Sequence, residues 1–176
     1  MKVFRAPSIR TALILALLLT AGLCRPGFAQ APALPPQLIS VAEAHAIIEG
    51  AVAAAREKNL RLGVVVLDTD GEIVAAERMD GAPGRNIQFA AGKAFASVMY
   101  RTTSQAMAEL YKTAPARYFG IMNSYGNRVY LVGGGMPLVV DGKLVGGVGI
   151  AGTNQDDTFA EAGIAAWEKV RASLRK

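Results

Sequence analysis

The sequence predicts an α/β domain in which helices back a five-stranded antiparallel sheet. Segments with helical periodicity alternate with short apolar, β-branched segments in the order α-β-β-α-α-β-β-β-α. The strands are separated by turns of hairpin length, which join antiparallel neighbours. The chain has 176 residues, which is enough for one hydrophobic core even after an N-terminal targeting segment is removed. We therefore expect a single domain without internal repeats.

Residues 1–29 are typical of a secretory signal peptide. Basic residues are followed by an apolar run at positions 12–19, and then by small residues at the spacing that signal peptidase recognises. The apolar run is too short for a membrane-spanning helix, which needs about 20 residues, so we expect no stable membrane anchor. Cleavage is expected after Ala29, with Ala31 as the alternative. The mature protein is then secreted or periplasmic.

The mature protein differs from the full chain in charge and in cysteine content. The signal peptide holds four of the 19 Lys and Arg residues and none of the 14 Asp and Glu residues, so cleavage lowers the net charge from +5 to +1. This balance argues against a nucleic-acid partner. Cys24, the only cysteine, is also removed, which excludes disulfides and thiolate chemistry. We expect no lipoprotein signal at Cys24, because Leu23 stands where a small residue is needed.

The domain is expected to occupy residues 38–176, after a Pro-rich, extended leader at 30–37. Ser40 and Glu43 form a capping box, which predicts a helix that runs to about Lys58. The side chains predicted to share its apolar face are Val41, Ala44, His45, Ile47, Ile48, Ala51 and Val52.

A β-hairpin is predicted next, with a turn at residues 68–71 and a second strand that ends at about Arg78. Two helices follow, at 86–100 and 104–112, and either Thr103 or Ser104 caps the second one. The segment from Thr113 to Asn127 is rich in aromatic and amide side chains and is expected to be irregular.

Strands at 128–132, 138–140 and 144–151 are predicted to complete the sheet, with a tight turn at 141–143. Either Asp156 or Asp157 then caps a closing helix. The apolar stripe of this helix consists of Phe159, Ala162, Ala166 and Val170.

Glycines are concentrated near the last strands, at positions 133–135 and at Gly146, Gly147 and Gly149. Neither cluster has the spacing of a P-loop or of a dinucleotide-binding turn, and neither opens a helix directly after a strand. A phosphate cradle is therefore not expected. Glycine inside a strand marks close approach by another segment or a ligand. We expect a bend at 133–135, and a flat strand on which the first helix or a ligand can lie.

Common catalytic patterns are missing from the sequence. A triad would have to be built around His45, the only histidine, but no nucleophile-elbow sequence accompanies it. The spacings of zinc ligands are also absent. Asp68 and Asp70 flank a turn and fit turn chemistry better than acid–base chemistry. An ordinary hydrolase or zinc enzyme is therefore not expected.

Several segments together resemble the GlcG/HbpS family, also called the DUF336 or haem-degrading domain. They are VVVLDTDGEIVAAERMDGA, AAGKAFAS, GGGMPLVVDGKLVGGVGIAG and QDD, in this order, and the resemblance runs from Leu38 to about Val170. It implies a profilin-like sandwich with a five-stranded antiparallel sheet and a tendency to form homo-oligomers. Family members often carry Ser in a GVSG-like segment, whereas residues 150–152 here are Ile-Ala-Gly. This leaves no hydroxyl group for a role at that position.

The resemblance implies that the protein binds haem or another small flat ligand, as a binding protein more than as a dedicated enzyme. Peroxide chemistry or haem degradation would follow from the bound iron. The side chains of the right type to ligate iron are His45 first, then Tyr118, Tyr125, Met79 and Met136. The cations suited to the haem propionates are Arg78, Arg85 and Lys93.

Simpler roles remain open for these residues. His45 is alternatively a buried histidine that is hydrogen-bonded to a neighbour, and Met79 fills the core. Arg78 and Lys93 are alternatively a solvated pair of charges. Two other functions also remain open for the protein: an accessory protein or enzyme that acts on a small, glycolate-linked organic acid, and a non-catalytic scaffold.

Overall fold

The structure is a computed structural model that describes residues 38–174, so the predicted signal peptide and the predicted leader lie outside the described residues. Four strands form one antiparallel sheet in the order β2-β1-β4-β3. Their bounds are β1 Gly63–Leu67, β2 Ile73–Arg78, β3 Gly135–Val140 and β4 Lys143–Ala151. The helices are α2 Val41–Glu57, α3 Arg85–Tyr100, α4 Ser104–Ala108, α5 Leu110–Thr113, α6 Pro115–Ser124 and α7 Asp156–Leu174, with a 3-10 turn η1 at Gly126–Arg128.

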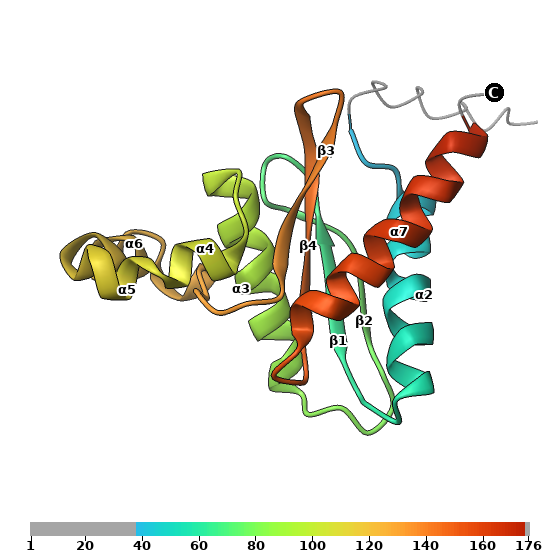
Figure 1. The fold of residues 1–176 in the computed structure, drawn as a ribbon, viewed down its shortest axis with the longest axis horizontal. Coiled ribbons are helices and arrows are strands. Elements are labelled where there is room, and N and C mark those ends of the chain that lie inside the picture. The colour runs from blue at the N-terminus through green and yellow to red at the C-terminus, as the bar shows by residue number, and fades with distance from the viewer. Residues whose placement is uncertain (1–37, 175–176) are drawn as a thin grey trace, which may run out of the picture. The chain divides into compact units, whose positions relative to one another are not determined.

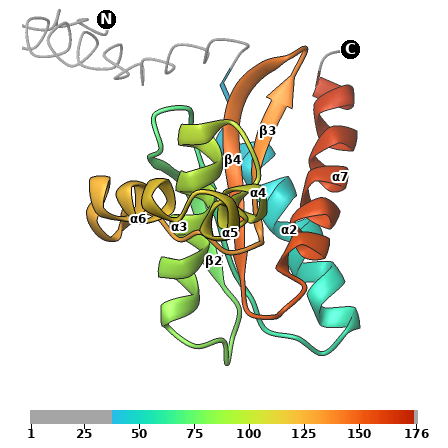
Figure 2. The same ribbon diagram turned by 60° about the vertical axis from the view of Figure 1, so that its left-hand side comes forward.

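The helices cover both faces of the sheet. Helices α2 and α7 pack against each other on one face, and α3 lies on the other (Figure 1). The three short helices α4 to α6 extend from the α3 side, away from α2 and α7 (Figure 1), and they lie toward the viewer in Figure 2. Between Leu38 and Leu174, no helix combines the length and the apolar character that a membrane span requires. The antiparallel sheet and the helices packed on its two faces confirm the predicted α/β class.

Helix α2 begins where the capping box predicts. The backbone N–H of Ser40 donates to Glu43 Oε2 at 2.9 Å, and the Glu43 N–H donates to the Ser40 hydroxyl at 3.3 Å. Its buried face, however, is rotated from the one expected: Val41 is 54% exposed and His45 is exposed. The buried face is centred on Ala44, and each residue advances about 100° around a helix, which carries the next residue, His45, toward solvent. The predictions of an apolar-faced or buried His45 are therefore wrong.

Glu43 connects the first turn of α2 to α7. Its Oε1 accepts hydrogen bonds from Arg171 Nη1 at 2.6 Å and from the Trp167 indole at 3.2 Å. Burial alone would raise the pKa of the Glu43 carboxyl. The hydrogen bonds from Ser40 and Trp167, together with the charge of Arg171, outweigh burial and hold that pKa below its ordinary value of 4.5. The carboxylate is thus kept charged between the two helices.

Both predicted hairpins are present. In the β1–β2 turn, Asp68 Oδ1 accepts the N–H groups of Asp70 and Glu72, each at 2.9 Å. In the β3–β4 turn, Asp141 and Gly142 have φ angles of 50° and 74°. Positive φ at both central residues is typical of the two-residue turns that suit the twist of a hairpin.

The predicted fifth strand at 128–132 is not formed. Residues 126–128 form η1, and the extended segment that follows packs on α3, where Val129 and Leu131 are buried. The N–H of Tyr130 donates to the carbonyl of Gly92 in α3 at 3.2 Å, not to a neighbouring strand. Alternation of buried and exposed residues in this segment therefore reflects contact with a helix, and the described sheet has four strands.

The segment between α3 and η1 is more helical than expected. The predicted helix at 104–112 is divided into α4 and α5, with Thr103 as the cap, since its hydroxyl accepts the Ala106 N–H at 3.1 Å. The segment expected to be irregular contains α6. Pro115 occupies the first position of α6, where a missing N–H costs nothing and a fixed φ favours the helix.

Candidate functional site

Helix α3 lies unusually close to the sheet because the strands beneath it carry glycine. A Cβ atom at Gly149 would collide with the carbonyl oxygen of Ala90, and one at Gly147 would lie 2.5 Å from Cγ2 of Val98. Gly135 makes the same kind of contact with the backbone of Lys93. Gly135, Gly147 and Gly149 thus accommodate α3, whereas Gly146 lies against Ile39 and the carbonyl of Leu67. The helix that lies close to these glycines is α3, not the first helix that the sequence suggested.

Lys93 is buried in this contact. Its Nζ lies 2.6 Å from Asp156 Oδ2 and 2.9 Å from the carbonyl oxygen of Ile150, and the Lys93 and Asp156 side chains are 3% and 6% exposed. The other carboxylate oxygen of Asp156 accepts the Thr153 N–H at 2.8 Å. The alternative reading of Lys93 as a solvated charge is therefore wrong, and its ammonium group already has a carboxylate partner.

The triple-glycine segment is also occupied by protein groups. The N–H of Gly134 donates to Asp157 Oδ1 at 2.7 Å, and the N–H of Gly135 donates to the Ser104 hydroxyl at 2.8 Å. Gly134 has a φ of 111°, which only glycine adopts readily. These donors serve α4 and α7, so the segment joins the sheet to those helices and has no N–H at 134 or 135 left for a phosphate.

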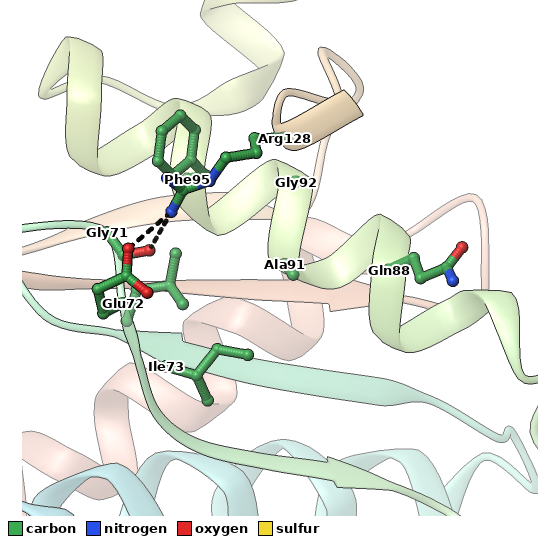
Figure 3. Close-up of a pocket in the computed structure, with 9 residues that line it drawn as sticks. Gly71, Glu72, Ile73, Gln88, Ala91, Gly92, Phe95 and Arg128 are labelled. Atoms are coloured by element: carbon green, nitrogen blue, oxygen red, sulfur yellow. Dashed lines mark hydrogen bonds and ion pairs between the residues drawn. The ribbon is translucent and has the colours of Figure 1, made fainter. Parts of the chain in front are cut away.

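The outer side of α3 borders two cavities. The first, of about 270 Å³, lies beside the β1–β2 turn and is shown in Figure 3. Arg128 closes one side of it: Nη2 donates to the Gly71 carbonyl at 3.1 Å and to Glu72 Oε1 at 3.0 Å. The guanidinium carbon of Arg128 also lies 4.3 Å from the centre of the Phe95 ring. The Arg128 side chain is 54% exposed, so part of the cation faces solvent.

The second cavity has a volume of about 540 Å³ and lies between α3 and α6. Its lining residues are Gln88, Phe89, Met122, Asn123, Gly126, Val129 and Tyr130. The Phe89 and Tyr130 rings are stacked, with centres 4.5 Å apart and planes inclined by 7°. Gln88 borders both cavities. We call the two cavities together the α3 groove.

The α3 groove has the general features of a ligand site. Pockets for small ligands range from about 300 to 1,000 Å³ and combine apolar and aromatic walls with few polar groups. The larger cavity lies within that range and offers an aromatic pair, a methionine and two amide side chains. The smaller cavity adds one cation, Arg128, and one carboxylate, Glu72.

Of the predicted iron ligands, only the two tyrosines lie on the α3 side. Tyr125 follows α6 and contacts Phe95 and Tyr100 edge to face, with ring centres 5.4 and 6.3 Å apart. Burial, and then a hydrogen bond with Tyr125, raise the pKa of the Tyr100 phenol. Tyr118 lies in the first half of α6, and its ring contacts the ring of Tyr111. Tyr125 therefore adjoins the α3 groove, whereas Tyr118 belongs to a separate aromatic cluster.

The other predicted ligand residues lie elsewhere. His45 is on the outer side of α2, while Met79 and Met136 pack in or against the core between the sheet and the α2–α7 pair. The Met79 sulfur accepts the Leu62 N–H at 3.3 Å, which supports the core-filling role. Arg78 and Arg85 are exposed at the end of β2 and the start of α3. The structure thus does not bring the predicted residues together in one site.

Sequence reasoning missed the residues that form the α3 groove. The sequence pattern places Phe89 in a helix and Met122 in an irregular segment, with no role in a site. It places Arg128 and Tyr130 in a strand. One signal was available: a large aromatic residue at position 89, in a helix whose buried face is made mostly of small residues. Such a residue indicates a partner on the outer side of the helix.

Comparisons with known proteins agree on one family. The family model described as haem degrading protein HbpS-like matches residues 39–165. The chain is 30% identical over 134 residues to the corrinoid adenosyltransferase PduO of Citrobacter freundii. That match covers 75% of this chain but only 40% of the relative. The chain therefore spans less than half the length of that enzyme.

Two solved structures share the fold. One is a PduOC:haem complex, with a TM-score of 0.67 and 28% identity, in a match that covers 73% of this chain and 94% of that chain. The other is HbpS, with a TM-score of 0.66 and 25% identity, in a match that covers 77% of this chain and 94% of that chain.

Proposed function

The chain belongs to the family of haem-degrading HbpS-like proteins, and on that basis we propose that it binds haem in the α3 groove. Family membership and the related haem complex support the ligand. One observation carries the location: a cavity of about 540 Å³ whose wall contains the stacked Phe89 and Tyr130 rings. This cavity combines the aromatic surface of Phe89 and Tyr130 with Met122, a side chain of a type that can ligate iron.

The residues of the α3 groove fit the chemistry of haem. The macrocycle is flat and apolar, which suits the Phe89–Tyr130 pair, and its iron accepts a thioether or phenolate ligand. Met122 supplies the thioether, and Tyr125 lies beside the groove as the alternative from the sequence. Arg128 would hold a propionate, because guanidinium groups bind carboxylates in a fork geometry.

Bound haem supplies one-electron and peroxide chemistry, and haem degradation is a consequence of such chemistry. The groove contributes orientation and control of solvent. Gln88 and Asn123 are hydrogen-bonding side chains at its wall, while Phe89 and Val129 limit the access of water. No residue of the groove forms a recognisable acid–base pair, which favours a binding protein over a dedicated enzyme.

Haemin titration tests this function. We expect a Soret band for the wild-type protein, a displaced band for Met122→Ala, and affinity reduced about tenfold or more for Phe89→Ala, which removes one ring of the pair. His45→Ala and Tyr118→Phe serve as controls outside the groove and should match the wild type. If His45→Ala alone loses the band, the groove is the wrong location. If the wild type shows no band, haem binding itself is refuted.

We further propose that the mature chain is exported and self-associates. The pattern of residues 1–29 supports export. A nearly neutral mature charge and the exposed rings of Tyr111 and Phe119, 59% and 53% exposed, support contact between copies.

Native mass spectrometry of the protein recovered outside the cytoplasm tests both points. We expect a chain that begins near Gln30 and a mass that is a multiple of this chain. A species that retains residues 1–29 would contradict export with cleavage. A monomer at micromolar concentration would contradict self-association.

A further inference from the structure

We propose that a second site, at the far end of β2 from the α3 groove, binds a small oxyanion through three arginines. A cavity of about 260 Å³ lies there. Its lining residues are Arg56, Arg61, Glu77, Arg78, Met79 and Asp80, and we call it the arginine cleft. Ile73 lines the first cavity of the α3 groove and begins β2, whereas Arg78 ends it. At about 3.3 Å per residue the two sites are roughly 17 Å apart.

Three different elements bring the arginines together. Arg56 lies in the last turn of α2, Arg61 lies in the link to β1, and Arg78 is the last residue of β2. The link and the end of β2 are joined by two contacts: the Met79 N–H donates to the Leu62 carbonyl at 3.0 Å, and the Leu62 N–H donates to the Met79 sulfur at 3.3 Å. The core thus fixes the backbone on both sides of the cleft.

Two of the guanidinium groups are held in place by backbone carbonyls. Arg78 Nη1 donates to the carbonyl of Ala82, and Arg61 Nη1 donates to the carbonyl of Leu60 at 3.0 Å. A guanidinium has five N–H donors, so most donors of each group remain for a ligand. A group already held in one orientation loses less entropy when it binds, which favours recognition of an anion.

The charges of the cleft do not cancel. Its lining contains three arginines and two carboxylates, Glu77 and Asp80. Within residues 38–174, none of these three arginines forms an ion pair with a carboxylate. Three permanent positive charges face two carboxylates, which leaves an excess positive charge that a bound anion would neutralise.

The ligand class follows from size and donor chemistry. A cavity of about 260 Å³ is smaller than most pockets for drug-sized molecules, but it holds several waters of about 30 Å³ each or one small anion. Guanidinium forks match the oxygen geometry of phosphate and carboxylate groups. We therefore assign the cleft to a small molecule that carries one of these two groups.

The test is an NMR titration of the full chain with sodium phosphate and, separately, with sodium malonate, against sodium chloride at equal ionic strength. We expect saturable shifts of the amide signals of Leu62, Met79 and Ala82. Binding of phosphate alone identifies a phosphate-bearing ligand, and binding of malonate alone identifies a carboxylate. Arg78→Gln should weaken binding about tenfold, since one charge-assisted contact is lost.

Two further variants separate the site from general effects. Arg56→Gln should also weaken binding, and no hydrogen bond described for α2 depends on its side chain. Arg101→Gln removes an exposed arginine at the end of α3 and should leave binding unchanged. The proposal is overturned if neither anion gives a saturable shift, or if all three variants respond alike. Either result is independent of haem binding in the α3 groove.

Discussion

Replacing Lys93 by methionine lowers the free energy of unfolding by about 3–5 kcal/mol, because it leaves a buried carboxylate without its cation. Asp156 is 6% exposed, and its Oδ2 lies 2.6 Å from Lys93 Nζ. The methionine side chain fills similar space, so the loss reports the missing charge and not a cavity. Urea unfolding followed by the fluorescence of Trp167, the only tryptophan, measures the difference.

The chain contains a matched control for this experiment. Lys112 pairs with Glu109 at 2.8 Å, but these side chains are 71% and 50% exposed. Lys112→Met should therefore change the free energy of unfolding much less than Lys93→Met does, as is usual for exposed ion pairs. Equal effects of Lys93→Met and Lys112→Met would contradict the role assigned to the buried pair.

Replacing Gly149 by alanine should lower the free energy of unfolding by about 3 kcal/mol, although it adds only a methyl group. The new Cβ would overlap the carbonyl oxygen of Ala90, which belongs to the backbone of α3 and cannot rotate away. Helix and strand must separate, which disturbs close packing along the whole contact. Because Phe89 lies next to Ala90, the same change should also weaken the binding of haemin.

Gly120 provides the opposite case. It lies in α6, and a Cβ at this position would meet no atom within 4 Å. Gly120→Ala should raise the free energy of unfolding by up to about 1 kcal/mol, since alanine favours the helix. Thermal or urea unfolding of Gly149→Ala and Gly120→Ala, each compared with the wild type, tests both predictions. A Gly149→Ala protein as stable as the wild type would show that the α3 contact is loose.

The elements predicted correctly are those specified by neighbouring residues. The capping box at Ser40 and the turn at Asp68 act over three or four positions, so they can be read directly from the sequence. The segment from Thr113 to Asn127 was misleading, because its aromatic and amide side chains indicate an irregular segment although Pro115 begins helix α6 there. Residues 128–132 were misleading for a different reason: burial against a helix and burial against a sheet both produce alternation in an extended segment.

The candidate site was predicted less well than the fold. His45 is the side chain of the right type for iron, but its exposure depends on how α2 is rotated against α7, and the local residue pattern does not reveal that rotation. Phe89, Met122 and Tyr130 come from three different segments, which line one cavity only in the folded protein. Arg128 binds Glu72 in the β1–β2 turn, and these two residues are 56 positions apart in the chain. Contacts of this range leave no local pattern to detect.

The contact between Glu43 and Arg171 has a consequence for the synthesis of the protein. These residues are separated by 128 positions, and they join the first described helix to the last. A ribosome adds about 5–20 residues per second, so α2 waits on the order of ten seconds for α7 to be made. During that time the side chains of Ile47 and Ile48, which are buried in the folded protein, lack the packing contacts that α7 provides. Folding is therefore completed only after the whole domain has been synthesised, and α2 is the segment for which a chaperone has time to bind.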